Sequence, residues 1–185
     1  MVMVEEITRQ GRTNLDIDSY LMKKSNTIYL TGEINDDKAM EIIKKIQYIN
    51  EKGKDDVVLV INSPGGSVTA GLAIYDMIQA SQNDVVTIGI GQVASMGAFL
   101  LASGNKRYVY PHCEIMIHQV SSQLAGNVID MDISIDRIKS QNEMILDLLA
   151  KHTHNTYEKI QQYTQRDYYL DAQQALKLGM IDKIL

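Results

Sequence analysis

Short runs of apolar residues alternate along the chain with segments in which apolar residues recur every three or four positions. The runs at residues 27–30, 57–61 and 85–90 are predicted strands, and the second is continuously apolar, as in a strand buried on both faces. The segments at residues 37–50 and about 68–80 are predicted helices. This βαβαβα order predicts an α/β domain built on a parallel sheet.

The same pattern predicts a helix at residues 98–102, two shorter strands at 107–110 and 114–117, and a mostly helical last third. One predicted helix, from about residue 128 to 151, contains no Gly or Pro. At ~1.5 Å per residue it would extend for roughly 36 Å. Apolar residues occupy more than one of its faces: Ile129, Ile133, Ile135, Ile138, Ile145, Leu148 and Leu149. Either it projects and needs a partner, or it is a central core helix.

Composition narrows the class of protein. The chain has 185 residues, of which 45% are apolar, so we expect one domain with a well-buried core. A net charge of −5 without clustered Lys or Arg argues against nucleic acid or an anionic membrane as partner. Cys113 is the only cysteine, which excludes an internal disulfide. The first residues lack a signal-peptide pattern and the longest apolar run, 93–102, is too short to span a bilayer, so we expect a cytoplasmic protein.

Ser95 is a candidate nucleophile. It lies among small residues in the segment 91–97, between a predicted strand and a predicted helix. A serine at such a junction presents its hydroxyl outward, while the amides that follow point toward the group it attacks. An ordinary βα turn has the same composition, so this signal is weak by itself.

A second glycine-rich turn, residues 62–67, closes the strand at 57–61. Its paired glycines, Gly65 and Gly66, allow close approach of the backbone to a ligand and leave amides free for an oxygen. The turn is a candidate second edge of an oxyanion hole. A phosphate-binding loop is disfavoured, because neither Gly-Lys-Ser/Thr nor Gly-x-Gly-x-x-Gly follows. A plain βα turn is the alternative.

A serine nucleophile needs a base and the base needs an acid. Of the four histidines, His118 ends the strand at 114–117, an edge where catalytic groups of α/β folds collect. His112 falls in a turn, and capping explains His152 and His154, which alone would make an incomplete metal site. Asp167 is a loop carboxylate that residue type alone assigns to a helix cap or a surface charge.

Four segments in this order resemble the ClpP family, the proteolytic subunits of Clp protease: residues 62–76, 91–101, 114–119 and 166–167. The resemblance implies an α/β, ClpP/crotonase-like fold of repeated ββα units with a projecting handle helix. It implies Ser95 as nucleophile, His118 as general base and Asp167 as orienting acid, with the amides of Gly65 and Met96 as the oxyanion hole. It implies neither cofactor nor metal.

The resemblance also implies an assembly. Family members form two heptameric rings that stack through the handle helix into a closed barrel, a tetradecamer. A separate Clp-type ATPase unfolds protein substrates and threads them into the chamber. In this chain the handle would be about residues 128–151 of a single peptidase domain, 27–185. Residues 1–26 would be a flexible segment or line the axial pore.

The chain departs from the family pattern at several contact surfaces. Residues 120–123 replace a Pro and paired glycines, Gln165 replaces an acidic residue, and Val60 replaces an aromatic one. We therefore hypothesise a divergent paralogue that works best in a mixed barrel. Two alternatives stay open: a poorly active or non-catalytic ring subunit, and a crotonase-type acyl-CoA enzyme, which also places two amides on an oxyanion.

Overall fold

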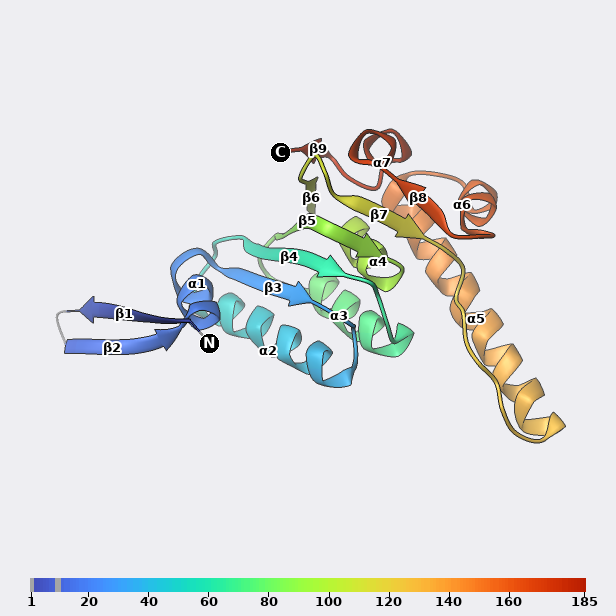
Figure 1. Cartoon of the computed structure of the whole chain (residues 1–185), viewed down its shortest axis with the longest axis horizontal. Coiled ribbons are helices and arrows are strands. Elements are labelled where there is room, and N and C mark those ends of the chain that lie inside the picture. The colour runs from blue at the N-terminus through green and yellow to red at the C-terminus, as the bar shows by residue number, and fades with distance from the viewer. Residues whose placement is uncertain (1, 9–10) are drawn as a thin grey trace.

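The computed structural model describes residues 2–8 and 11–185, and its centre is a seven-stranded sheet (Figure 1). The strands are β3 (Thr27–Thr31), β4 (Val57–Ser63), β5 (Val85–Ala94), β6 (Lys106–Val109), β7 (Glu114–Ile117), β8 (Tyr168–Leu170) and β9 (Lys183–Ile184). The main path is β3-β4-β5-β6-β9, while β7 pairs with β5 and β8 pairs with β7. All pairs are parallel except β7–β8. The predicted α/β class with a parallel sheet is confirmed.

The helices of the main body follow the strands as predicted, with boundaries that differ by a few residues. They are α2 (Asp36–Lys52), α3 (Val68–Ala80), α4 (Met96–Ala102), α5 (Val128–Thr153), α6 (Tyr157–Thr164) and α7 (Ala172–Leu178). Helix α2 begins one residue earlier than predicted because the Asn35 side chain accepts a hydrogen bond from the Lys38 amide. Its buried stripe is Ala39, Ile42, Ile46 and Ile49.

Strand β5 is four residues longer than the sequence pattern predicts, and it serves two neighbours. Its first half, Val86 to Gly89, pairs with β6, and its end, Gln92 to Ala94, pairs with β7. Between the halves the register with β4 shifts, and Gly91 has a φ of +60°. Because of this change of partner, the carboxyl end of β5 lies beside the carboxyl end of β7.

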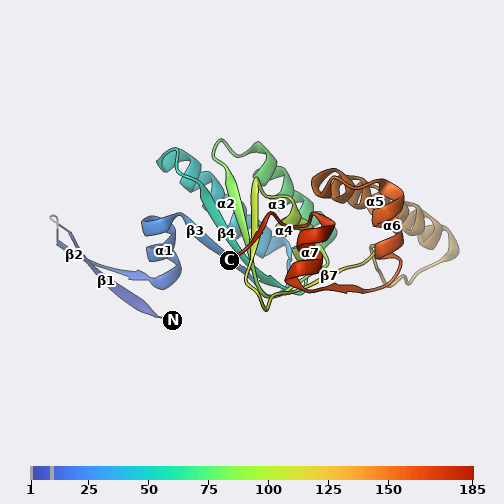
Figure 2. The ribbon, with the colours of Figure 1, turned by 90° about the horizontal axis from the view of Figure 1, so that it is seen from above.

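An N-terminal hairpin of β1 (Met3–Thr8) and β2 (Gly11–Asp16), followed by α1 (Ile17–Ser25), precedes the sheet. Figure 2 shows the hairpin at one end of the molecule, with α5 and α6 at the other. The sequence pattern predicted no element here, and residues 1–26 were expected to be flexible or to line a pore. In its described part this segment has regular secondary structure, and the lining of a pore remains a prediction.

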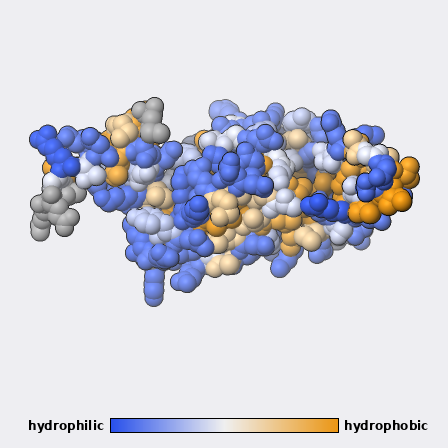
Figure 3. All heavy atoms as spheres, turned by 90° about the horizontal axis from the view of Figure 1, so that it is seen from below, coloured by the Kyte–Doolittle hydropathy of each residue, from blue (hydrophilic) through white to orange (hydrophobic). Residues whose placement is uncertain are grey.

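Helix α5 has 26 residues, and its two halves have different surroundings. Its second half is in the core, with Ile145, Leu146, Leu149 and Ala150 buried. Its first half exposes large apolar side chains: Val128 is 69% exposed, Ile129 73% and Ile133 64%. These residues belong to the hydrophobic area at one end of the molecule in Figure 3. Each interpretation of this helix, projecting or core, therefore holds for one half.

A buried arginine fastens the end of the chain to the sheet. Arg107, 8% exposed, donates hydrogen bonds to both carboxylate oxygens of Asp182 and to the backbone carbonyls of His152 and Gly179. The hydrogen bonds from Arg107 to Asp182 hold the pKa of the Asp182 carboxyl below its ordinary value. The residues after β8 are thus fixed to β6 and to the end of α5.

Candidate active site

Three strands bring the candidate residues to one edge of the sheet. Ser95 follows β5, His118 follows β7, and the Gly65–Gly66 turn follows β4. The three strands are parallel neighbours, so their carboxyl ends lie side by side. Residues separated by more than 50 positions in the sequence therefore meet without any long excursion of the chain.

Ser95 has an unusual backbone and an available hydroxyl. Its φ of +54° and ψ of −121° are rare for a residue other than glycine. Its amide donates to the carbonyl of Met116, and its carbonyl accepts from the amide of Phe99 in α4. The side chain makes no capping bond to α4. Instead, Ser95 Oγ lies 2.7 Å from Nε2 of His118, which is a hydrogen-bonding distance.

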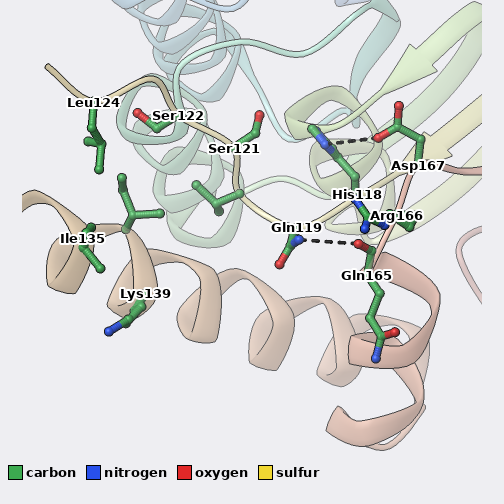
Figure 4. Close-up of a pocket in the computed structure, with 12 residues that line it drawn as sticks. His118, Gln119, Ser121, Ser122, Leu124, Ile135, Lys139, Gln165, Arg166 and Asp167 are labelled. Carbon is green, nitrogen blue, oxygen red and sulfur yellow. Dashed lines mark hydrogen bonds and ion pairs between the residues drawn. The ribbon is translucent and has the colours of Figure 1, made fainter.

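Asp167 lies on the other side of the His118 ring. Its Oδ1 is 3.6 Å from His118 Nδ1, an ion-pair distance that exceeds the normal length of a hydrogen bond (Figure 4). Register explains the approach: β8 runs antiparallel to β7 with Ile117 opposite Tyr168, so the next residues, His118 and Asp167, also face each other. The Asp167 side chain is 59% exposed, so water competes for the carboxylate.

The two glycines after β4 have different roles. The amide of Gly65 donates to Oγ of buried Ser63 at 3.1 Å, and a Cβ on Gly65 would lie 2.7 Å from Cβ of Ser95. Gly65 is therefore packed against the candidate nucleophile, with its amide already used. Gly66 is exposed, and its amide has no hydrogen-bond partner in the described part of the chain. The assignment of Gly65 as an oxyanion donor stays a prediction, but the geometry favours Gly66.

Two cavities adjoin these residues. A small one, about 60 Å³, is bordered by Ser95, Met96 and Gly66. Its apolar walls come from α3, α4, β7 and α5: Val68, Phe99, Ile117, Ile145 and Leu149. An open groove of about 750 Å³ continues from His118 and Asp167 along residues 119–122 to Ile135 and Lys139 of α5 (Figure 4). Residues 118–121 line both the groove and the small cavity, so the two spaces share a wall.

The other candidates from the sequence lie elsewhere. His112 is exposed in a turn, and His154 caps α5 in a left-handed conformation. The ring of His152 bonds to the hydroxyl of Tyr75, and burial lowers its pKa. Burial, aided by the charge of Glu114, raises the pKa of the Cys113 thiol to about 11. Cys113 is therefore not a thiolate nucleophile at neutral pH.

Within residues 2–8 and 11–185, no three His, Cys, Asp or Glu side chains are grouped as metal ligands. None of the helices in those same residues is long and apolar enough to cross a bilayer.

The sheet brings Ser95 and Asp167 to opposite sides of the His118 ring, an arrangement typical of serine hydrolases. Comparison with known families makes this specific. A family model described as Clp protease matches residues 9–185. The chain belongs to the Clp protease family, as the resemblance implied.

Proposed function

We propose that this protein is a serine endopeptidase, the proteolytic subunit of an ATP-dependent Clp protease. The observation that carries the proposal is the 2.7 Å contact between Ser95 Oγ and His118 Nε2, with Asp167 on the far side of the ring. Membership of the Clp protease family supports the same reaction. Peptide bonds of unfolded proteins are the proposed substrate.

The proposed reaction is acyl transfer. His118 takes the proton of the Ser95 hydroxyl through Nε2 as Oγ attacks the peptide carbonyl, and Asp167 stabilises the imidazolium. The amides of Met96 and Gly66 stabilise the oxyanion. Met96 is the first residue of α4, and both residues border the small cavity beside Ser95. His118 then protonates the leaving amine. Finally, His118 activates the water that hydrolyses the acyl-enzyme.

Covalent labelling tests the proposal directly. We expect a small fluorophosphonate to add one phosphonyl group to Ser95 with loss of fluoride, because only a hydroxyl next to a base reacts at a useful rate. Intact-mass measurement and peptide mapping check the stoichiometry and the site. Ser103, buried with its hydroxyl bonded to the Leu100 carbonyl, serves as an internal control and should stay unmodified.

Modification of several serines at similar slow rates would contradict an activated Ser95. So would the absence of labelling in a sample whose particles are fully assembled. Either result would leave a non-catalytic ring subunit, or an acyl-CoA enzyme of the crotonase type, as the better interpretation.

The exposed half of α5 supports the proposed assembly into stacked heptameric rings. Large apolar side chains on a projecting helix need a partner, and the Clp protease family offers a second copy. The divergence at residues 120–123 and at Gln165 supports pairing with a second, more typical paralogue. The ATPase partner and the cytoplasmic location remain predictions.

Replacement of Ile133 by Asp should weaken this assembly. Ile133 is 64% exposed on α5, so a charge there costs the monomer little but would be buried against a neighbouring ring. We expect analytical ultracentrifugation to show the loss of the largest particles and a shift to single rings or smaller species. Asp136→Lys changes charge on an exposed residue of the same helix and is the control. An unchanged distribution for Ile133→Asp would place this surface outside the ring contact.

A further inference from the structure

The chain that leaves His118 is held by two consecutive backbone amides. The Gln119 amide donates to the carbonyl of Thr164 at 2.8 Å, which ties it to the end of α6, just before the loop that carries Asp167. The Val120 amide donates to Oδ1 of Asn142 at 2.9 Å, which ties it to α5. The first bond is between backbone groups and does not depend on side-chain identity. The second depends entirely on the side chain at position 142.

Asn142 lies on the face of α5 that borders the small cavity. It precedes Ile145 by three residues and Leu149 by seven, a spacing that places all three on one stripe of a helix. Ile145 and Leu149 form one wall of the cavity beside Ser95, and Val120 with Ser121 forms another. The bond from Val120 to Asn142 therefore joins two walls of the cavity directly.

This bond is also the last one that fixes the segment. From Ser121 to Asn127 every residue is exposed. The hydrogen bonds that the structure gives these seven residues are to their own neighbours, such as Ser122 to Gln123 and Asn127 to Asp130. Val120, by contrast, is half-buried and packed against the core. The bond to Asn142 thus marks the point where the groove wall changes from residues bonded to the protein body, 119–120, to residues bonded only to their neighbours, 121–127.

We propose that Asn142 is a positioning residue that shapes the peptide pocket by holding Val120 against α5. This inference rests on the proposed peptidase function. It assigns a role in substrate binding to a side chain that touches neither the nucleophile nor the base. A substrate side chain would occupy the small cavity beside Ser95. The bond between Val120 and Asn142 would fix the position of one wall of that cavity.

The effect of losing this bond should fall on KM more than on kcat. His118 stays fixed by β7 and by the neighbouring bond from Gln119 to Thr164, so the proton transfer is preserved. The wall formed by Val120 and Ser121 is loosened, which weakens the binding of substrate and transition state alike. Such uniform loss raises KM and leaves kcat nearly unchanged.

Asn142→Leu tests the inference, because leucine has a similar size and favours a helix but accepts no hydrogen bond. We expect KM for a short fluorogenic peptide to rise about 5- to 20-fold, the lower part of the range for an amide left without its acceptor, with kcat changed less than about 2-fold. Asn142→Asp keeps an acceptor oxygen and should recover most of the loss. Glu143→Leu, at an exposed neighbouring position, controls for a leucine on this helix.

Two further readouts separate this inference from the proposed function. Amide hydrogen exchange over residues 119–124 should become at least about 10-fold faster in Asn142→Leu and stay unchanged in Glu143→Leu, whether or not the protein cleaves peptides. The labelling rate of Ser95 by a small fluorophosphonate, which does not fill the pocket, should stay within about 2-fold. Unchanged exchange in Asn142→Leu would overturn the inference, and so would equal KM values for the two leucine variants.

A double-mutant cycle provides the last check. Val120→Pro removes the donor of the same bond. If the two groups act through this bond, adding Asn142→Leu to Val120→Pro should produce no further rise in KM. Independent, multiplying effects of the two changes would mean that Asn142 acts on the pocket by another route, which contradicts the proposal.

Discussion

Ser95→Ala should lower the turnover of a short fluorogenic peptide about a million-fold, to the background of the oxyanion hole and binding alone. The reason is that the change removes Oγ of Ser95, the hydroxyl that lies 2.7 Å from Nε2 of His118. Steady-state hydrolysis at saturating peptide, with active-site titration of the unmodified protein, measures the effect.

The alanine variant isolates the chemistry because it leaves the backbone as it was. Alanine keeps Cβ and tolerates the φ of +54° no better and no worse than serine. The amide bond to the Met116 carbonyl does not involve the side chain. Thermal unfolding and sedimentation should therefore match the unmodified protein. Retained turnover above about one per cent in a folded, assembled variant would end the case for Ser95 as the nucleophile.

Asp167→Asn should have the second largest effect, a loss of about 10⁴-fold in kcat, as in other Ser-His-Asp sites. In the proposed mechanism the carboxylate keeps the proton on Nδ1 of His118 and leaves Nε2 free to accept from Ser95. An amide at this position can donate to Nδ1, which favours the tautomer with a proton on Nε2. That tautomer cannot accept the proton from Ser95. Kinetics across a range of pH measures the loss.

The control for this variant is Asp147→Asn, which removes a carboxylate from an exposed position on α5. It should leave kcat within about 2-fold. Asp167 lies 3.6 Å from His118 and is exposed to water, so a full 10⁴-fold loss is a strict test of its role. A loss of less than about 10-fold in Asp167→Asn would mean that other contacts, such as the strand β7 itself, suffice to orient His118.

The main sheet and its helices could be predicted because their patterns are strong. Continuous β-branched runs mark β4 and β5, and helix-period spacing marks α2 and α3, so each element was found with small errors at its ends. The sequence pattern does not predict the last four residues of β5, because glycine and glutamine interrupt the apolar run there. Their strand conformation is imposed by pairing with β7, a contact between residues distant in the sequence.

The juxtaposition of His118 and Asp167 could not be derived from the pattern. It depends on β8, a strand of three residues, which is too short to leave a period in the sequence. Residue type alone assigns Asp167 to a helix cap or a surface charge, and only the resemblance implies a role for it. The register of β8 against β7 supplies the physical reason for its position.

The sequence also could not show which glycine amide of the turn is already hydrogen-bonded. Gly65 and Gly66 are indistinguishable by residue type, and the difference between them comes from Ser63, whose hydroxyl accepts from one amide and donates to the Gly32 carbonyl. Asn142 was not singled out at all, because an asparagine within a long helix reads as an ordinary surface residue. Its partner, Val120, becomes visible only when α5 is placed beside the groove.

The backbone conformation of Ser95 works against the stability of the protein that carries it. A side chain held at positive φ costs on the order of 1–3 kcal/mol, and glycine would avoid that cost because it has no Cβ. A change that relieved the strain would also remove the hydroxyl. If Ser95 is the nucleophile, as proposed, heat resistance and reactivity make opposite demands on this one position, and selection for a more stable protein would favour its loss.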